Sequence, residues 1–204
     1  MSKPGQEPPR LVTVEEFLAG PADAFGEIHD GVMLECMAQS PVHDRVVHRL
    51  RSALEYSIDP DGPCREVHGD TPMRLADNDH GDPRRRLRAR YPDLILRDCS
   101  GGPYDVGQVA DQTLLVVEVT SDSTIDDDIG IKRELYARAG IPVYLIVHFD
   151  KDWQQITVIE ELRLDWSGRR YVGWNQHTEA LVLTDPVKVA VMFEDLQSQL
   201  PRRW

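Results

Sequence analysis

Two acidic residues stand in or beside apolar segments of this 204-residue chain. Asp93 precedes the apolar residues 94–96, and Glu118 interrupts the β-branched segment 114–119. A carboxylate is costly to bury unless a partner compensates its charge. One divalent cation would meet that need for both side chains. We therefore expect Asp93 and Glu118 to bind the same ion.

The segments that carry these acids have the composition of strands. Residues 92–97 follow a proline that is tolerated at a strand start, and residues 112–119 form the most apolar run, typical of a central strand buried on both faces. If the two strands pair, both carboxylates reach one cation at the edge of the sheet. Oxygen ligands of this kind suit Mg²⁺ or Mn²⁺, which can polarise a phosphodiester oxygen and supply hydroxide near neutral pH.

A lysine near such an ion would orient the attacking water or stabilise the developing negative charge. Lys132 is the candidate, on a helix predicted over residues 128–139 and ended by Gly140. A strand at 143–148 follows, and the order strand, helix, strand predicts a crossover to a parallel neighbour. Tyr136 lies one helical turn after Lys132, where it is expected to pack with its hydroxyl satisfied.

The remaining patterns predict the elements around this segment. Thr13 and Glu16 form a capping box for a helix to Leu18, and Asp30-Gly31 favours a type I′ hairpin between 25–29 and 32–36. Ser40-Pro41 begins a helix that reaches about Tyr56. The other expected elements are short strands at 64–68 and 71–75, a polar surface loop at 78–90, an antiparallel meander at 155–164 and 170–174 followed by 181–183, and a terminal helix at 193–200.

The fold class predicted from these elements is α/β, with a mixed β-sheet flanked by helices and an antiparallel C-terminal meander. The length suits one domain, residues 13–204, after a disordered lead-in at 1–12. No apolar run approaches the length of a membrane span, and the N-terminus lacks the apolar core of a signal peptide. Cys36, Cys64 and Cys99 are odd in number and without CxxC spacing, so we expect neither a zinc cluster nor a disulfide framework, and a cytoplasmic location.

Charge is unevenly distributed along the chain. The net charge of −12 argues against a general nucleic-acid coat protein, which is usually basic. Five arginines nevertheless lie within residues 84–90, directly before Asp93. They can form a local basic rim that holds phosphates, or simply a solvated loop. The acidic run Asp126-Asp127-Asp128 is explained by the helix dipole alone.

Five separate segments are similar, in order, to the putative restriction endonuclease family, bacterial proteins with a PD-(D/E)XK-type nuclease fold. These segments are 27–31, 40–43, 91–93, 117–124 and 132–142, within a resemblance that covers about residues 13–150. The resemblance implies metal binding by Asp93 and Glu118, with Glu27 as a further acid. It also implies that the lysine has moved from the usual position, here Thr120, to Lys132.

The resemblance also implies a homodimer, for which the C-terminal meander with Trp153, Trp166 and Trp174 offers a surface; the alternative is that these tryptophans only close the core. The chain departs from the family pattern at Asp122, Val143 and His148, where the family commonly has proline, glutamate and aspartate. These positions lie at the rim and leave the two central acids intact.

Each candidate residue also has a purely structural interpretation. Asp93 can be a strand-end acid that reaches solvent, Glu27 the outward residue of a hairpin, and Lys132 a solvated helix lysine. His43 can pack or cap at a helix N-terminus. Glu118 is harder to explain in this way, because apolar residues flank it on both sides.

The function predicted from the sequence is a Mg²⁺- or Mn²⁺-dependent endonuclease that hydrolyses DNA phosphodiester bonds. Asp93, Glu118 and Lys132 are the expected catalytic residues, and Asp93, Glu118 and Glu27 the expected metal ligands. The expected DNA contacts are Arg84, Arg85, Arg86, Arg88, Arg90 and His43. The alternatives are a catalytically silent nuclease-fold module for binding or assembly, and a hydrolase of a small phosphoester or nucleotide.

Overall fold

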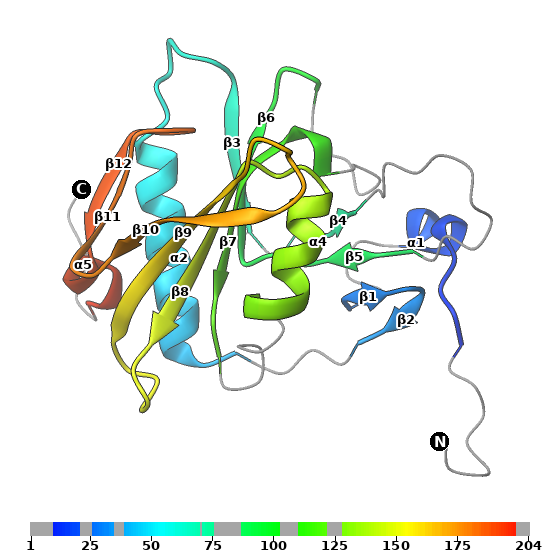
Figure 1. Ribbon diagram of the computed structural model, residues 1–204, viewed down its shortest axis with the longest axis horizontal. Helices are drawn as coiled ribbons and strands as arrows, with labels where there is room; N and C mark the ends of the chain where they lie inside the picture. The colour runs from blue at the N-terminus through cyan, green and yellow to red at the C-terminus, as the bar shows by residue number, and fades with distance from the viewer. Residues whose placement is uncertain are drawn as a thin grey trace.

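A six-stranded sheet in the order β10-β9-β8-β7-β6-β3 forms the centre of the molecule (Figure 1). The computed structural model describes residues 10–20, 26–34, 39–69, 71–75, 87–102, 110–121 and 128–198. The strands of this sheet are β3 (Arg65–Gly69), β6 (Leu94–Asp98), β7 (Thr113–Val119), β8 (Val143–Phe149), β9 (Ile156–Leu164) and β10 (Tyr171–His177).

The sheet is mixed, because β7 and β8 run parallel while the other neighbours are antiparallel. The strand predicted to be central, β7, lies between β6 and β8 and is almost entirely buried, as expected. In the β6–β7 register Leu94 faces Val117. Asp93 lies directly before β6 and Glu118 lies within β7, so the two chain segments that carry the acids are neighbours in the sheet.

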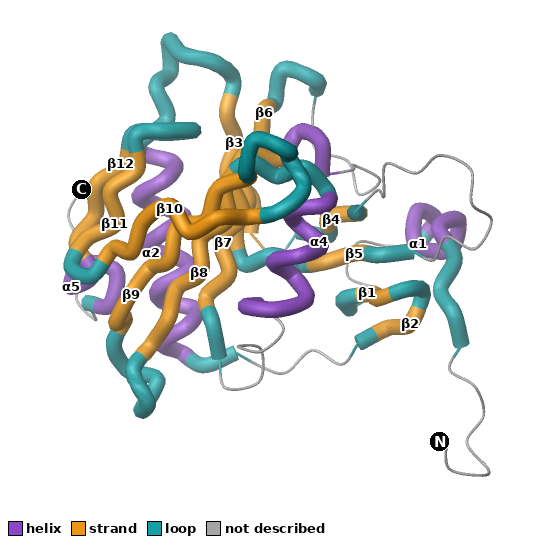
Figure 2. Tube along the Cα trace, viewed as in Figure 1, coloured by secondary structure: helices purple, strands orange, loops and turns teal. Residues whose placement is uncertain are grey.

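Two helices cover opposite faces of the sheet (Figure 2). On one face lies α2 (Pro41–Tyr56), which begins where predicted: the Ser40 side chain accepts the His43 N–H, and Pro41 occupies the first turn. The other face carries α4 (Arg133–Arg138), which is preceded by a π-helical turn, η2 (Asp128–Lys132). The predicted helix at 128–139 is therefore two kinds of helix, and it ends at Gly140, whose φ is +81°.

A core lies on each face of the sheet. Because side chains alternate along a strand, Val117 and Val119 face α2 whereas Val116 and Glu118 face α4. The α2 face is filled by Val46, Leu50, Leu54, Leu94, Leu96, Leu115, Leu145 and Val147, and the α4 face by Ile95, Leu135, Tyr136, Tyr144, Ile146, Leu162 and Tyr171.

A second, smaller sheet lies beside the large one, in the order β2-β1-β5-β4 (Figure 1). It contains β1 (Ile28–His29), β2 (Val32–Met33), β4 (Met73–Arg74) and β5 (Ala89–Arg90), with α1 (Val14–Ala19) next to it. The predicted capping box of α1 is present, and the predicted hairpin turn has positive φ at Asp30 and Gly31. The prediction of a surface loop over residues 78–90 is wrong at its C-terminal end. Leu87 and Ala89 are buried against Phe17 and Ile28, and Ala89 and Arg90 form the strand β5.

The C-terminal part differs from a simple meander. Strands β9 and β10 pair antiparallel as predicted, but β11 (Ala180–Leu183) pairs with β12 (Val189–Met192) in a separate two-stranded sheet. Apolar side chains of this pair fill the α2-side core, together with the short helix α5 (Phe193–Gln197). A 3₁₀ turn, η1 (Ala110–Gln112), precedes β7.

Cys64 and Cys99 form a disulfide, so the expectation of no disulfide is wrong. The pairing of β3 with β6 places Arg65 opposite Asp98, which brings the preceding Cys64 and the following Cys99 next to each other, with their Cα atoms 5.2 Å apart. Local cysteine spacing carries no information about such a long-range strand pairing. Cys36 lies outside the described residues. None of the described helices is long and apolar enough to span a membrane.

Candidate active site

Lys132 joins two glutamates that are far apart in the sequence. Its Nζ lies 3.2 Å from Glu27 Oε1 and 3.1 Å from Glu118 Oε2. All three side chains are largely buried, with exposures of 6% for Lys132, 12% for Glu27 and 4% for Glu118. Glu27 precedes β1, Glu118 is on β7, and Lys132 ends the π-helical turn. The solvated surface role considered for Lys132 is therefore excluded.

Tyr136 fixes the other oxygen of Glu118. The Tyr136 hydroxyl donates a 2.6 Å hydrogen bond to Glu118 Oε1. Burial, together with the charges of Glu118 and Glu27, raises the pKa of Tyr136 well above its usual range, so the hydroxyl stays a neutral donor. Tyr136 is thus a packed tyrosine with a satisfied hydroxyl, as expected, and the partner of this hydroxyl is the central acid.

Asp93 has a different set of contacts. Its Oδ2 accepts a 2.6 Å hydrogen bond from the Val119 backbone N–H, and its Oδ1 lies 3.2 Å from His43 Nε2. Burial lowers the pKa of His43, but the carboxylates of Asp93 and Asp44 raise it more, so the net shift is upward. The structure thus places His43 beside a predicted metal ligand, at the start of α2.

Of the predicted arginine rim, the described residues are Arg88 and Arg90. Arg90 is completely buried; it donates to the Ile28 carbonyl, contacts His29 Nδ1, and has its Nε 3.7 Å from Glu27 Oε2. Arg88 is partly buried and donates to Asp30 at 2.6 Å. Arg90 is therefore not available to bind DNA, because strand β5 turns it into the site. Arg84, Arg85 and Arg86 lie outside the described residues.

The donor set fits a hard divalent cation. Mg²⁺ is commonly bound by one or two carboxylates together with waters and substrate phosphates. Glu27 and Glu118 supply two carboxylates on either side of the Lys132 nitrogen, whereas Asp93, directly before β6, contacts His43 and the Val119 N–H instead. Within the described ranges, no group of three or more His, Cys, Asp and Glu side chains is arranged to hold a metal. The fit therefore rests on the two glutamates, with Lys132 between them.

A second buried charged cluster, on the opposite face of the sheet, was not predicted from the sequence. Glu161 on β9 accepts a 2.7 Å hydrogen bond from Arg163 Nε and lies 3.1 Å from His177 Nε2. Arg163 also contacts Asp185 and stacks under Trp174. The sequence signal for this cluster was the acid pair Glu160-Glu161 between apolar residues of a predicted strand, a pattern weaker than the single acid that identified Glu118.

Comparisons with known proteins identify the family and the fold of the chain. The model of the Uma2 family, described as "Putative restriction endonuclease", matches residues 14–191. A crystal structure of a protein from Anabaena variabilis, described as a putative nuclease, has the same fold with a TM-score of 0.62. It is 14% identical in sequence, and the match covers 91% of this chain and 97% of that one. The sequence matches none of the curated proteins with which it was compared.

Proposed function

Because this chain belongs to the Uma2 family of putative restriction endonucleases, we propose that it is a metal-dependent endonuclease that hydrolyses DNA phosphodiester bonds. Family membership supports a nuclease function in general. The observation that favours a working site in this chain is the cluster of Glu27, Glu118 and Lys132. Two buried carboxylates next to one amine are expensive to maintain, and such groups concentrate at functional sites.

Glu118, Glu27 and Asp93 would hold the ion, which is Mg²⁺ or Mn²⁺. When bound, such an ion supplies Lewis-acid activation of a phosphodiester oxygen and a water of lowered pKa. Tyr136 keeps Glu118 in one orientation through its 2.6 Å hydrogen bond. The backbone N–H of Val119 holds Asp93, with His43 next to it. Lys132 would supply a positive charge beside the bound ion, which can stabilise negative charge developing on a phosphate.

The proposed DNA contacts are Arg88 and the arginines at 84–86. His43 is only 4% exposed, so like Arg90 it is not available to contact DNA. A homodimer is also part of the proposal. Trp166 and Trp174 are 97% and 66% exposed, so they do not close the core and are available at a subunit contact. Sedimentation of the wild type and of a Trp166→Ser variant tests the dimer, since loss of the contact would shift the protein towards monomer.

The test of the function is nicking of supercoiled plasmid DNA with MgCl₂ or MnCl₂. Wild type should nick the plasmid, and Glu118→Ala should not, because it removes the proposed ligand. Glu134→Ala is the matched control, since Glu134 is an exposed acid on α4 that pairs with Arg138. Equal nicking by wild type and Glu118→Ala would refute the assignment and favour a nuclease-fold binding or assembly module.

A further inference from the structure

The Lys132 ammonium occupies the position between two acids that a metal ion would need. Its Nζ is nearly equidistant from Glu27 Oε1 and Glu118 Oε2, at 3.2 Å and 3.1 Å. Lysines are almost never fully buried unless they are paired, so this burial needs a compensating role. The three groups come from three separate segments of the chain, and the tertiary fold is what assembles them.

Charge balance within the cluster offsets the cost of burying its carboxylates. Glu27 and Glu118 would repel each other in a buried site of low dielectric constant if no cation lay between them. Lys132 contacts both, and Arg90 approaches Glu27 from the other side, with its Nε 3.7 Å from Oε2. The two carboxylates and the two cationic side chains thus compensate one another's charge.

A divalent ion and the ammonium compete for the same position. Mg²⁺ binds oxygen at about 2.0–2.1 Å, closer than the N···O contacts of an ammonium. An ion bound to both glutamates would therefore occupy the space in which the Lys132 nitrogen now lies. Tyr136 and Arg90 do not block it, because each is directed to the other oxygen of its glutamate.

We propose that Lys132 is the built-in cation of the metal-free protein, and that a divalent ion binds between Glu27 and Glu118 only by displacing its ammonium. The proposal rests on the proposed function only for the type of ion. It assigns Lys132 a role in metal affinity that is separate from any role in hydrolysis. It also makes the Glu27–Glu118 gap, rather than the Asp93 carboxylate, the principal position of the ion.

The direct test is thermal unfolding in EDTA and in excess MnCl₂. Lys132→Met removes the charge and keeps a long apolar side chain, so in EDTA its melting temperature should fall by about 10 °C. MnCl₂ should then raise the melting temperature of this variant by about 5–10 °C, and that of wild type by clearly less, because wild type must first displace the amine. Lys132→Arg keeps the charge and should melt close to wild type in EDTA.

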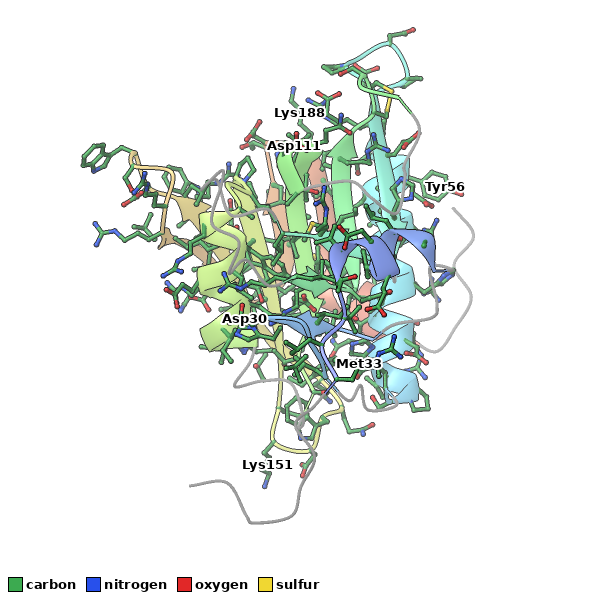
Figure 3. The ribbon with its side chains drawn as sticks, turned by 90° about the vertical axis from the view of Figure 1, so that its right-hand side faces the viewer. Asp30, Met33, Tyr56, Asp111, Lys151 and Lys188 are labelled. Atoms are coloured by element: carbon green, nitrogen blue, oxygen red, sulfur yellow. A yellow bond between two sulfur atoms is a disulfide. The ribbon has the colours of Figure 1, made fainter. Side chains whose placement is uncertain are left out.

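Lys151→Met is the matched control for loss of a lysine. Lys151 is exposed on the turn between β8 and β9 and points away from the body of the molecule (Figure 3). The Lys151→Met variant should have the melting temperature of wild type both in EDTA and in MnCl₂. The double variant Glu27→Gln/Lys132→Met removes one acid as well as the amine. The double variant should regain most of the stability lost in Lys132→Met, and MnCl₂ should raise its melting temperature by less than it raises that of Lys132→Met.

Two results would overturn the proposal. One is a Lys132→Met protein that melts as wild type in EDTA, and the other is an MnCl₂ shift no larger in that variant than in wild type. If Lys132→Met does not fold in EDTA, refolding is repeated with MnCl₂. Folding of Lys132→Met in MnCl₂ supports the proposal. If Lys132→Met still does not fold in MnCl₂ but the double variant folds, the proposal is contradicted. Absence of plasmid nicking by wild type would refute the nuclease function and leave these melting results standing.

Discussion

Two buried glutamates on the same sheet have the same exposure and different surroundings. Glu118 on β7 and Glu161 on β9 lie on either side of β8, each with a side chain 4% exposed. Each is bound to a cation that also contacts a second acid: Lys132 contacts Glu27, and Arg163 contacts Asp185. Burial and ion pairing alone therefore do not distinguish a candidate active site from a structural cluster.

The difference lies in the second acid and in the kind of cation. Asp185 is 75% exposed, so water solvates its charge, whereas Glu27 is only 12% exposed and depends on the protein. Arg163 uses the fixed fork of a guanidinium and stacks on Trp174, while Lys132 is a single point charge that a metal ion can replace. Glu161 also contacts His177 on the adjacent strand. A replaceable cation between two buried acids is what indicates function here.

The largest expected difference between the two glutamates is in activity. Glu118→Gln should lower the rate of metal-dependent plasmid nicking by about 1000-fold, because it weakens the site of an ion that contributes several kcal/mol to catalysis. Glu161→Gln should stay within about twofold of wild type. Rates are measured at a temperature at which circular dichroism shows both variants folded. A comparable loss in Glu161→Gln would remove the distinction between the clusters.

The next difference concerns rescue by metal. Arg163→Met leaves Glu161 buried with His177 alone, and it should lower the free energy of unfolding in urea by about 3 kcal/mol. MnCl₂ should not restore this stability, in contrast to Lys132→Met, because only one of the acids around Arg163 is buried. Recovery of Arg163→Met with MnCl₂ would show that both clusters can bind a cation.

A pair of buried tyrosines gives a finer comparison. The Tyr136 hydroxyl donates to Glu118, and the Tyr171 hydroxyl donates to the Ile141 carbonyl at 2.8 Å. Replacing either tyrosine with phenylalanine should cost about 1–2 kcal/mol in unfolding free energy. Only Tyr136→Phe should also weaken the MnCl₂-dependent stabilisation of the protein. Equal metal responses in both variants would mean that Tyr136 does not position Glu118.

The smallest expected effect involves Glu160, the neighbour of Glu161 on the α4 side of the sheet. The imidazole of His148, with its Nε2 3.7 Å from Glu160 Oε2, lowers the pKa of Glu160 below its usual value. A lowered carboxyl pKa contributes stability above the unfolded-state pKa, and this contribution is lost as the pH falls through the folded-state pKa. Glu160→Gln should therefore lose less stability than wild type between neutral and acidic pH. Solvent screening keeps the difference below about 1 kcal/mol, measured by urea unfolding at several pH values.

Local patterns predicted most of the elements that position the site. The apolar strand around Glu118, the Ser40 cap of α2 and the Gly140 stop all appear as expected. These features depend on side-chain alternation, capping and backbone sterics within a few residues, so a short window of sequence contains the information. The π-helical turn before α4 was not predicted, because its helical periodicity resembles that of an ordinary first turn.

Sequence by itself thus determined which acids interrupt apolar strands and which lysine follows them on a helix. Only the tertiary structure decided that Lys132 meets Glu27 as well as Glu118, that Asp93 contacts Val119 and His43, and that Arg90 is buried. The physical reason is that contacts between distant charges depend on strand register and on the packing of helices across the sheet. A shift of one residue in register would turn every side chain of a strand to the opposite face, and no local pattern records that choice.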